Sequence, residues 1–572
     1  MSLGELRRPT RLDHGIGFGL MALYVCFLAA TSLDVGVPRD ESFYFYAADR
    51  AGDWVLGLFD PAVESFSRAE VDRGFEYNNE HPVLMKMLFG VSHRLLHDRW
   101  GLVEAHMTAW RLPTMVMAGL SLWLTWLLGV MVRGRLVGAF AALALAFMPR
   151  VFFHAHLACF DAPVTFTNLL IAFCFLRAAR SRRWAVASGV ALGLGFATKL
   201  NTFFVPFTLL LVAIYDAWLF RRRTGAWKAA RAARGPLTYY TWVAVSMVVL
   251  GGAVFFAHWP WLWFDTVDRV RAYVAFHAKH VHYPVDYLGH LYFRPPFPVH
   301  FPFVFSALTI PVGILLCGLV GFAVAVRDAR AGWKAGVEGA DRRSVEVFLL
   351  ACVLVPFLVI AMPYTPIFGG TKHWMPAMPF FAVLAGLGLE RVGQGMWPAL
   401  VAGRGAGALR VRTAILGGLM WAPAVWATVT YGAHGPTYFN ALAGGPPGGA
   451  ELGMPRNFWG YSTVAILPII NEQVERGGFV FWHKATKWAI DAYQRDGLLR
   501  GDVRYTGDWT AAYSNWGVYH DQREKLPEEL DIWRAYGTDW PVGGFFIDGL
   551  QIMSVYHRPA APAAPSIPPG GR

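Results

Sequence analysis

The chain has few charged residues for its length. Only 16% of its 572 residues are Asp, Glu, Lys or Arg, whereas 55% are hydrophobic. Soluble domains carry about 25% charged residues, so the composition excludes an ordinary soluble protein. The mean hydropathy of +0.36 indicates a membrane protein with some mass exposed to water.

Cysteine is scarce as well, with five residues in the chain. No two of them have CxxC spacing, and four lie inside apolar segments. This pattern indicates neither a disulfide framework nor a thiolate metal site. The chain also has no glycine-rich phosphate loop and no internal repeat, so we expect neither a nucleotide-binding loop nor a repeat architecture.

Positive charge is in excess, with a formal net charge of +12. In a soluble protein this excess would suggest a nucleic-acid partner. Here most of it lies in short loops between apolar segments, where it reports the orientation of the chain in the membrane. We therefore expect no nucleic-acid partner.

Apolar segments that could cross a membrane recur along the chain. A span needs about 20 mostly apolar residues, and by this criterion the sequence predicts about eleven transmembrane helices. The first has no clear cleavage site, so we interpret it as an uncleaved helix. The expected helices cover residues 15–37, 112–132, 136–151, 162–176, 184–197, 202–220, 238–257, 301–326, 345–362, 374–389 and 413–430.

Along the chain, loops rich in arginine alternate with loops that are not rich in arginine. By the positive-inside rule the arginine-rich loops face the cytoplasm, which leaves residues 38–111 and 258–300 as long outer loops. Within the first, residues 83–97 have apolar side chains at helical spacing with basic ones between them, a pattern typical of a helix lying in the membrane interface. Most polar residues near helix ends fall on the outer side, as expected for an active site at one membrane surface.

Three domains follow from these patterns. We predict a transmembrane domain over residues 1–432 and an outward-facing α/β domain over residues 433–558, where short alternating apolar runs flank a helical stretch. The tail, residues 559–572, is rich in Pro, Ala and Gly and is expected to be disordered. The fold class is therefore an α-helical polytopic membrane protein with a small C-terminal α/β domain.

An acid pair, Asp40-Glu41, follows the first predicted helix and precedes four consecutive aromatic residues. Acids at a membrane edge are costly to desolvate, so they are a functional hypothesis by default. The alternative is a pair of solvated loop acids without chemistry.

Further acids and cations lie near the predicted outer ends of other helices. Asp161 precedes Ala162-Pro163 at a helix start. The remaining candidates are Glu80, His81, Lys86, Arg150, Lys199, Lys372 and His373. Each has a simpler interpretation: Lys86 could extend along the interface with its ammonium in water, Asp161 could cap its helix, and the other cations could anchor at the level of the lipid head groups.

Together these residue types suit one reaction. An enzyme that moves a sugar from a lipid phosphate needs a carboxylate to accept the proton of the acceptor hydroxyl. It also needs cations that hold the phosphate as negative charge develops on it. The acids are Asp40, Glu41 and Asp161, and the cations are Lys86, Arg150, Lys199 and Lys372.

Histidines are frequent in the outer loop over residues 258–300, together with several tryptophans. They could bind a metal or belong to an aromatic belt at the interface. No pair in that loop has HxxxH spacing with a nearby acid, as a helical zinc site would require. No cofactor is indicated, and a requirement for a divalent metal stays open.

The order of the motifs resembles the GT-C superfamily of membrane glycosyltransferases. The likeness is to polyprenyl-phosphate-mannose protein O-mannosyltransferases and to the lipid A aminoarabinose transferase. It spans about residues 37–460 and is strongest over residues 39–201. The segment from Tyr438-Phe439-Asn440 to Trp459-Gly460 resembles bacterial members.

The resemblance implies specific roles for the candidate residues. Asp40 would be the general base of an inverting transfer, supported by Glu41, and Asp161 would orient the acceptor or the base. Lys86, Arg150 and Lys199 would bind the donor phosphate. His81-Pro82-Val83 replaces the usual His-Pro-Pro of the family, and no loop is long enough for the β-trefoil insert of eukaryotic members.

We therefore expect a glycosyltransferase of the bacterial cytoplasmic (inner) membrane, with its active site and C-terminal domain facing outward. Its partners would be a polyprenyl-phosphate sugar, membrane lipid, and a protein, lipid or polysaccharide acceptor. Two alternatives stay open. A transporter or flippase of lipid-linked sugars would need polar residues at mid-membrane, and a non-catalytic scaffold would depend on its outer domain alone.

Overall fold

The computed structural model describes residues 6–179, 181–224, 236–279, 281–334, 344–402, 405–506 and 511–558. The chain forms two compact units. The helical unit comprises Met1–Val35 and Phe43–Met454, and the C-terminal unit comprises Gly36–Ser42 and Pro455–Arg572. The tail predicted to be disordered, residues 559–572, lies outside the described residues.

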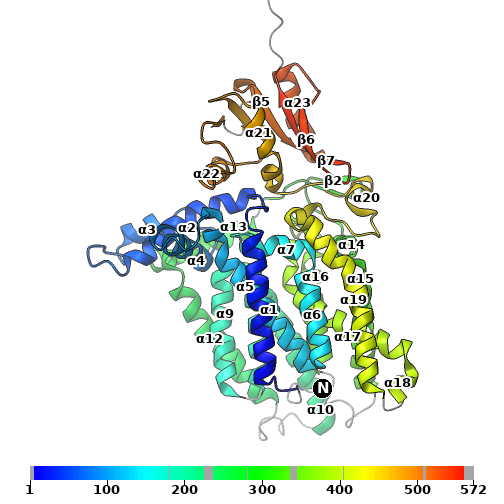
Figure 1. Cartoon of the computed structure of the whole chain (residues 1–572). Helices are drawn as coiled ribbons and strands as arrows, with labels where there is room; N and C mark the ends of the chain where they lie inside the picture. The colour runs from blue at the N-terminus through cyan, green and yellow to red at the C-terminus, as the bar shows by residue number, and fades with distance from the viewer. Residues whose placement is uncertain are drawn as a thin grey trace, which may run out of the picture. The chain divides into compact units, whose positions relative to one another are not determined.

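Long apolar helices make up most of the helical unit (Figure 1). Within the described ranges, eight helices are long and apolar enough to cross a membrane, or up to nine if one bent pair counts as a span. The predicted polytopic helical fold is confirmed, whereas the count of eleven stays a prediction. The longer helices are α1 (Arg11–Ala30), α5 (His106–Val132), α8 (Asp161–Ala178), α9 (Arg182–Thr198), α10 (Phe204–Thr224), α12 (Pro236–Ala257), α15 (Val312–Lys334), α16 (Ser344–Ile360), α17 (Met378–Met396) and α19 (Ala406–Tyr431).

Two segments predicted as single helices are broken in the structure. The first forms α6 (Arg135–Ala146) and α7 (Pro149–His156), which meet at 68°. The second forms α14 (Phe301–Thr309) and α15, with Pro311 between them. Proline lacks a backbone N–H and clashes with the preceding turn, so it begins a helix more readily than it continues one.

Other elements complete the helical unit. The predicted amphipathic helix over residues 83–97 is seen as an α-helix followed by a π-helix, α4 and η1. The remaining elements are α2 (Arg39–Gly57), α3 (Arg68–Phe75), α4 (Leu84–Ser92), η1 (His93–Arg99), η2 (Leu200–Phe203), η3 (Pro260–Trp263), α13 (Thr266–Ala278), β1 (Val285–Tyr287), β2 (His290–Tyr292), η5 (Gly370–His373), η6 (Met375–Ala377), α18 (Pro398–Ala402), η7 (Gly432–Thr437) and α20 (Gly445–Glu451).

Small residues let the long helices approach closely. At Gly388 on α17 a Cβ atom would lie 1.9 Å from the carbonyl oxygen of Cys317 on α15, and at Gly321 on α15 it would lie 1.9 Å from that of Leu384. Any larger side chain would force the two helices apart. Close packing at small residues is the usual basis of helix association in membranes.

A five-stranded sheet with the order β4-β3-β5-β7-β6 forms the core of the C-terminal unit. Strand β3 pairs in parallel with β4 and β5, and β7 pairs antiparallel with β5 and β6. The predicted C-terminal α/β architecture is confirmed. Its elements are η8 (Tyr461–Ile466), α21 (Leu467–Gln473), β3 (Phe479–Trp482), α22 (Lys487–Arg495), β4 (Arg504–Tyr505), η9 (Ala511–Tyr513), β5 (Trp516–His520), η10 (Arg523–Lys525), α23 (Leu526–Tyr536), β6 (Gly543–Ile547) and β7 (Leu550–His557).

Candidate active site

Asp161 and Lys199 form a buried ion pair in the helical unit. Asp161 is the first residue of α8, and Lys199 follows the last residue of α9. Because α8 and α9 are joined by a short connection and pack antiparallel, the start of one lies beside the end of the other. The Lys199 Nζ donates to Asp161 Oδ1 at 2.5 Å, with side-chain exposures of 19% and 3%. The structure thus brings together two residues that the sequence proposed separately.

His154 and Arg150 approach this pair from α7, where they are one helical turn apart. The His154 Nδ1 lies 3.6 Å from Asp161 Oδ2. Arg150 donates to the carbonyl oxygens of Pro436 and Tyr438 at 2.7 and 3.2 Å. The guanidinium therefore joins α7 to the segment that includes Tyr438-Phe439-Asn440. Its predicted contact with a phosphate stays a prediction.

Lys86 closes the loop that carries Glu80 and His81. Its Nζ donates to the carbonyl oxygens of Asn78 and His81 at 2.6 and 2.9 Å, and its side chain is 1% exposed. Asn78 in turn donates from Nδ2 to Glu80 Oε1 at 2.7 Å. Burial lowers the pKa of Lys86 to about 7, while the charge of Glu80 opposes this shift.

Burial and the positive charges of lysine side chains lower the pKa values of two histidines, His81 and His373. Burial and the positive charges of Lys86, Lys199 and Lys372 hold the pKa of His81 well below its usual value. Burial, together with Lys372 and Lys199, lowers the pKa of His373 to about 3. Neutral His373 donates from Nε2 to the carbonyl oxygen of Phe368 at 2.6 Å. Lysines from three distant parts of the chain therefore lie in one region.

Aromatic rings connect the loop of His81 to the start of α8. The ring of Tyr44 lies 4.3 Å from that of Phe160, the residue before Asp161, and 5.9 Å from that of His81. His81 also contacts Phe160 edge-on at 5.5 Å. We call Lys86, Lys199, Lys372 and Asp161 the lysine cluster. The positive charges of Lys86, Lys199 and Lys372 all act on His81, and Lys199 is paired with the buried Asp161. This excess of positive charge favours an anionic ligand.

The acid pair Asp40-Glu41 is grouped with the C-terminal unit and not with the lysine cluster. Both acids lie in the first turn of α2, where the helix dipole stabilises negative charge. The backbone N–H of Arg39, a donor that the helix leaves without an internal partner, donates to the carbonyl oxygen of Trp459 at 2.8 Å.

Residues of the C-terminal unit fix the segment that enters α2. The N–H of Val37 donates to the hydroxyl of Tyr493 at 2.7 Å, and the hydroxyl of Thr486 donates to Ser42 Oγ at 2.7 Å. Sequence reasoning missed these positioning residues, because nothing in their local pattern connects residues more than 400 positions apart. In the sequence, only the pair Trp459-Gly460 indicated a turn in this region. The structure has φ values of +76° and +74° at these two residues.

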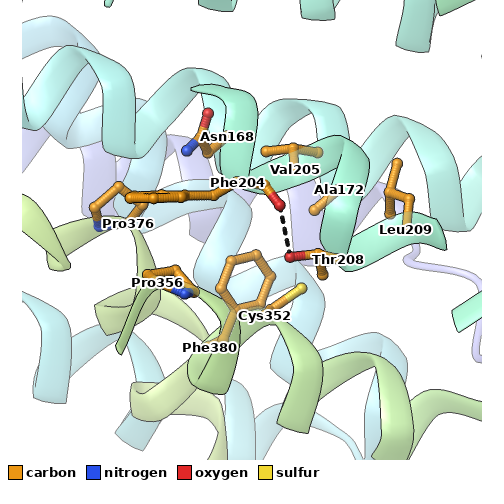
Figure 2. A pocket seen from close by; sticks show the side chains of 10 residues that line it. All are labelled: Asn168, Ala172, Phe204, Val205, Thr208, Leu209, Cys352, Pro356, Pro376 and Phe380. Atoms are coloured by element: carbon orange, nitrogen blue, oxygen red, sulfur yellow. Dashed lines mark hydrogen bonds between the residues drawn. The ribbon is translucent and has the colours of Figure 1, made fainter. Parts of the chain in front are cut away.

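A pocket opens between α8, α10, α16 and α17 in the helical unit (Figure 2). Its lining is largely apolar, with Asn168 and Thr208 as the polar side chains; Thr208 donates to the carbonyl oxygen of Phe204 at 3.0 Å. The buried amide of Asn168 has no hydrogen-bond partner among the described residues. Asn168 lies two turns after Asp161 on the same face of α8, about 10 Å along the helix.

Comparisons with known proteins match the part of the chain that contains most of these site residues. Residues 81–261 match the family model of the dolichyl-phosphate-mannose-protein mannosyltransferases, a stretch that includes Lys86, Arg150, Asp161 and Lys199. The predicted resemblance is confirmed. The chain resembles GT-C membrane glycosyltransferases. No curated protein sequence matches the chain significantly.

Solved structures of this kind are weakly similar to the chain. ArnT from Cupriavidus metallidurans bound to undecaprenyl phosphate is 15% identical, with a TM-score of 0.47 over 94% of this chain and 97% of ArnT. The Archaeoglobus fulgidus oligosaccharyltransferase AglB is 11% identical, with a TM-score of 0.45 over 86% and 65%. The S. cerevisiae Pmt1-Pmt2 complex is 17% identical, with a TM-score of 0.34 over 46% and 35%.

Proposed function

We propose that the protein transfers a sugar from a polyprenyl-phosphate donor to an acceptor hydroxyl at the outer face of a bacterial inner membrane. The observation that carries this proposal is the lysine cluster, which combines three cations with one buried carboxylate. All of its residues except Lys372 lie in the stretch that resembles mannosyltransferases. A phosphate monoester or diester supplies the negative charge that such a site favours. The acceptor is a protein, a lipid or a polysaccharide.

Donor binding uses charge at one end and apolar surface at the other. Lys86, Lys199 and Lys372, with Arg150 nearby, hold the phosphate, and His81, Glu80 and His373 shape the site around it. The isoprenoid tail extends along α8 into the apolar pocket that contains Asn168. Asp161 is a positioning residue in this arrangement, since it holds the Lys199 ammonium in place.

The transfer step needs a base and a stabilised leaving group. Asp40, supported by Glu41, accepts the proton of the acceptor hydroxyl while its oxygen attacks the anomeric carbon. The bond between the anomeric carbon and the phosphate oxygen breaks, and the electron pair stays on the phosphate. Attack from the face opposite the leaving group inverts the anomeric configuration. The cations of the lysine cluster stabilise the charge that develops on the phosphate.

The test is transfer by purified protein in vesicles supplied with a panel of polyprenyl-phosphate sugars. Mass spectrometry should detect free polyprenyl phosphate and a glycosylated acceptor for the wild type and for Asp34→Asn, a control at an exposed acid near the same segment. We expect Asp40→Asn to lower transfer by about 10²–10⁴-fold. Normal transfer by Asp40→Asn would remove Asp40 as the base. Movement of an unchanged donor across the bilayer would favour a flippase.

A further inference from the structure

A second cluster in the helical unit lies outside the proposed sugar-transfer site. It consists of His93, His97 and Asp98 on η1 and His106 at the start of α5, and we call it the histidine cluster. One ligand atom from each residue lies within 4.8 Å of the others. The π-helix that carries three of them is a rare conformation that occurs frequently at functional sites.

The separations between these atoms suit a bound metal ion. His93 Nε2 lies 3.0 Å from His106 Nδ1 and 4.0 Å from Asp98 Oδ1, and His97 Nε2 lies 3.8 Å from the same Asp98 oxygen. A tetrahedral zinc ion bound at about 2.0–2.2 Å by nitrogen and oxygen holds its ligand atoms about 3.3 Å apart. Small side-chain adjustments would bring all four atoms to that separation.

Neighbouring groups orient three of the four candidate ligands. His97 Nδ1 donates to the carbonyl oxygen of Val103 at 3.0 Å, so in the neutral ring Nε2 carries the lone pair. His93 Nδ1 lies 3.0 Å from Asp49 Oδ1, a carboxylate that also accepts from Trp110 Nε1 at 2.8 Å. Imidazole ligands of metals usually make such contacts through their second nitrogen.

The charge around the histidine cluster is negative. Asp98 uses Oδ2 to accept from Arg94 at 2.9 Å, which leaves Oδ1 turned toward the histidines. The same guanidinium pairs with Asp53 at 2.8 Å and lies 3.9 Å from Asp49. Three carboxylates therefore face one guanidinium, and a divalent cation would balance the remaining negative charge.

We propose that His93, His97, Asp98 and His106 bind one zinc ion. Three imidazoles and one carboxylate complete a tetrahedral site, so the ion has a structural role and leaves no position open for substrate. It joins the end of η1 to the start of α5 and, through Asp49, to α2. Its four ligands are distinct from the residues of the proposed sugar-transfer site.

The first test measures metal content. The full chain is purified without a histidine tag, incubated with zinc, passed over a desalting column and analysed by inductively coupled plasma mass spectrometry. We expect about one zinc per chain for the wild type and for His290→Ala, a control at an exposed outer-loop histidine. We expect loss of this zinc in His97→Ala and in His106→Ala. Equal zinc in wild type and both cluster variants, or none in any protein, would overturn the proposal.

The second test keeps the proposal falsifiable if an alanine variant misfolds. Asp98→Asn preserves the size of the side chain and changes only the ligand charge. Replacing zinc with Co²⁺ in the wild type should give the intense visible absorption of a tetrahedral site, and Asp98→Asn should weaken and shift it. Without a metal, the 3.0 Å contact between His93 and His106 is closed by a proton, and cobalt added to the wild type would give only the faint spectrum of the hydrated ion. That result would refute the site.

Discussion

The lysine cluster and the histidine cluster lie in the same helical unit but have opposite charge balance. In the first, the ammonium groups of Lys86, Lys199 and Lys372 act on His81, and Lys199 is paired with Asp161. In the second, three imidazoles and several carboxylates share a single guanidinium, that of Arg94. Within each cluster the polar side chains are buried to different extents, so burial alone does not say what binds. The sign of the local charge does, favouring a phosphate in the first and a metal cation in the second.

Helix α2 contacts the histidine cluster and also His81, on which the charges of the lysine cluster act. Its Tyr44 packs against His81 beside the lysine cluster, and its Asp49, five residues later, contacts His93 in the histidine cluster. The same helix begins with Asp40 and Glu41 in its first turn. A metal that holds Asp49 and His93 together would therefore restrain the helix that carries the proposed base.

Among variants of the two clusters, the largest effect should come from breaking the Lys199–Asp161 pair. We expect Lys199→Met to lower transfer by about 10²–10³-fold, since one charge that stabilises the leaving group is lost. It also leaves a buried carboxylate without its partner, which costs about 3–5 kcal/mol of stability. Transfer by mass spectrometry and thermal unfolding in detergent measure the two effects separately.

A double variant separates chemistry from folding at this pair. Lys199→Met/Asp161→Asn removes both charges, so we expect stability near that of the wild type and transfer as low as in the single variant. Lys487→Met, at an exposed lysine of the C-terminal unit, is the control and should behave as the wild type. Transfer restored together with stability would mean that Lys199 acts on the fold and not on the donor.

A smaller effect is expected at Lys372, whose positive charge acts on His81 and His373. Lys372→Met should raise the KM for the donor about tenfold, equivalent to about 1.4 kcal/mol, and change kcat less. His97→Gln, in the histidine cluster, should leave the donor KM unchanged. A larger rise in KM for His97→Gln than for Lys372→Met would contradict the assignment of the two clusters to different ligands.

Parts of this architecture follow directly from the sequence. The apolar segments predict the long helices. The hairpin of α8 and α9 explains why Asp161 and Lys199 meet, since Asp161 precedes one predicted span and Lys199 follows the next. Proline breaks were harder to predict. The segments around Pro149 and Pro311 are mostly apolar, and a hydropathy scale does not detect a missing backbone N–H.

Other parts depend on contacts between distant segments. The grouping of Asp40 with the C-terminal unit depends on Trp459, Tyr493 and Thr486, which no periodicity connects to residue 40. The histidine cluster was missed for a related reason. His93 and His97 have the HxxxH spacing of a helical metal site, but the third imidazole, His106, comes from the next helix and becomes a partner only when the intervening loop folds back.

The smallest effect should be a pH dependence of stability that Lys86 causes. Burial lowers the pKa of Lys86 to about 7 in the folded protein, whereas an unfolded lysine has a pKa of about 10.4. Between these values the unfolded chain binds more protons, so the free energy of unfolding rises with pH. The penalty for burying the ammonium is present in full below pH 7 and is relieved above it.

Lys86→Met removes this titration, so its stability should lack the rise. We expect the melting temperature of the wild type to increase relative to Lys86→Met by about 1–3 °C between pH 7 and pH 9, measured in detergent at constant ionic strength. Lys487→Met should follow the wild type over the same range. A difference in melting temperature between the two proteins that stays constant with pH would contradict this prediction. It would mean that the three acceptor atoms on Asn78 and His81 keep Lys86 charged. A charged ammonium would then be available to a phosphate throughout this range.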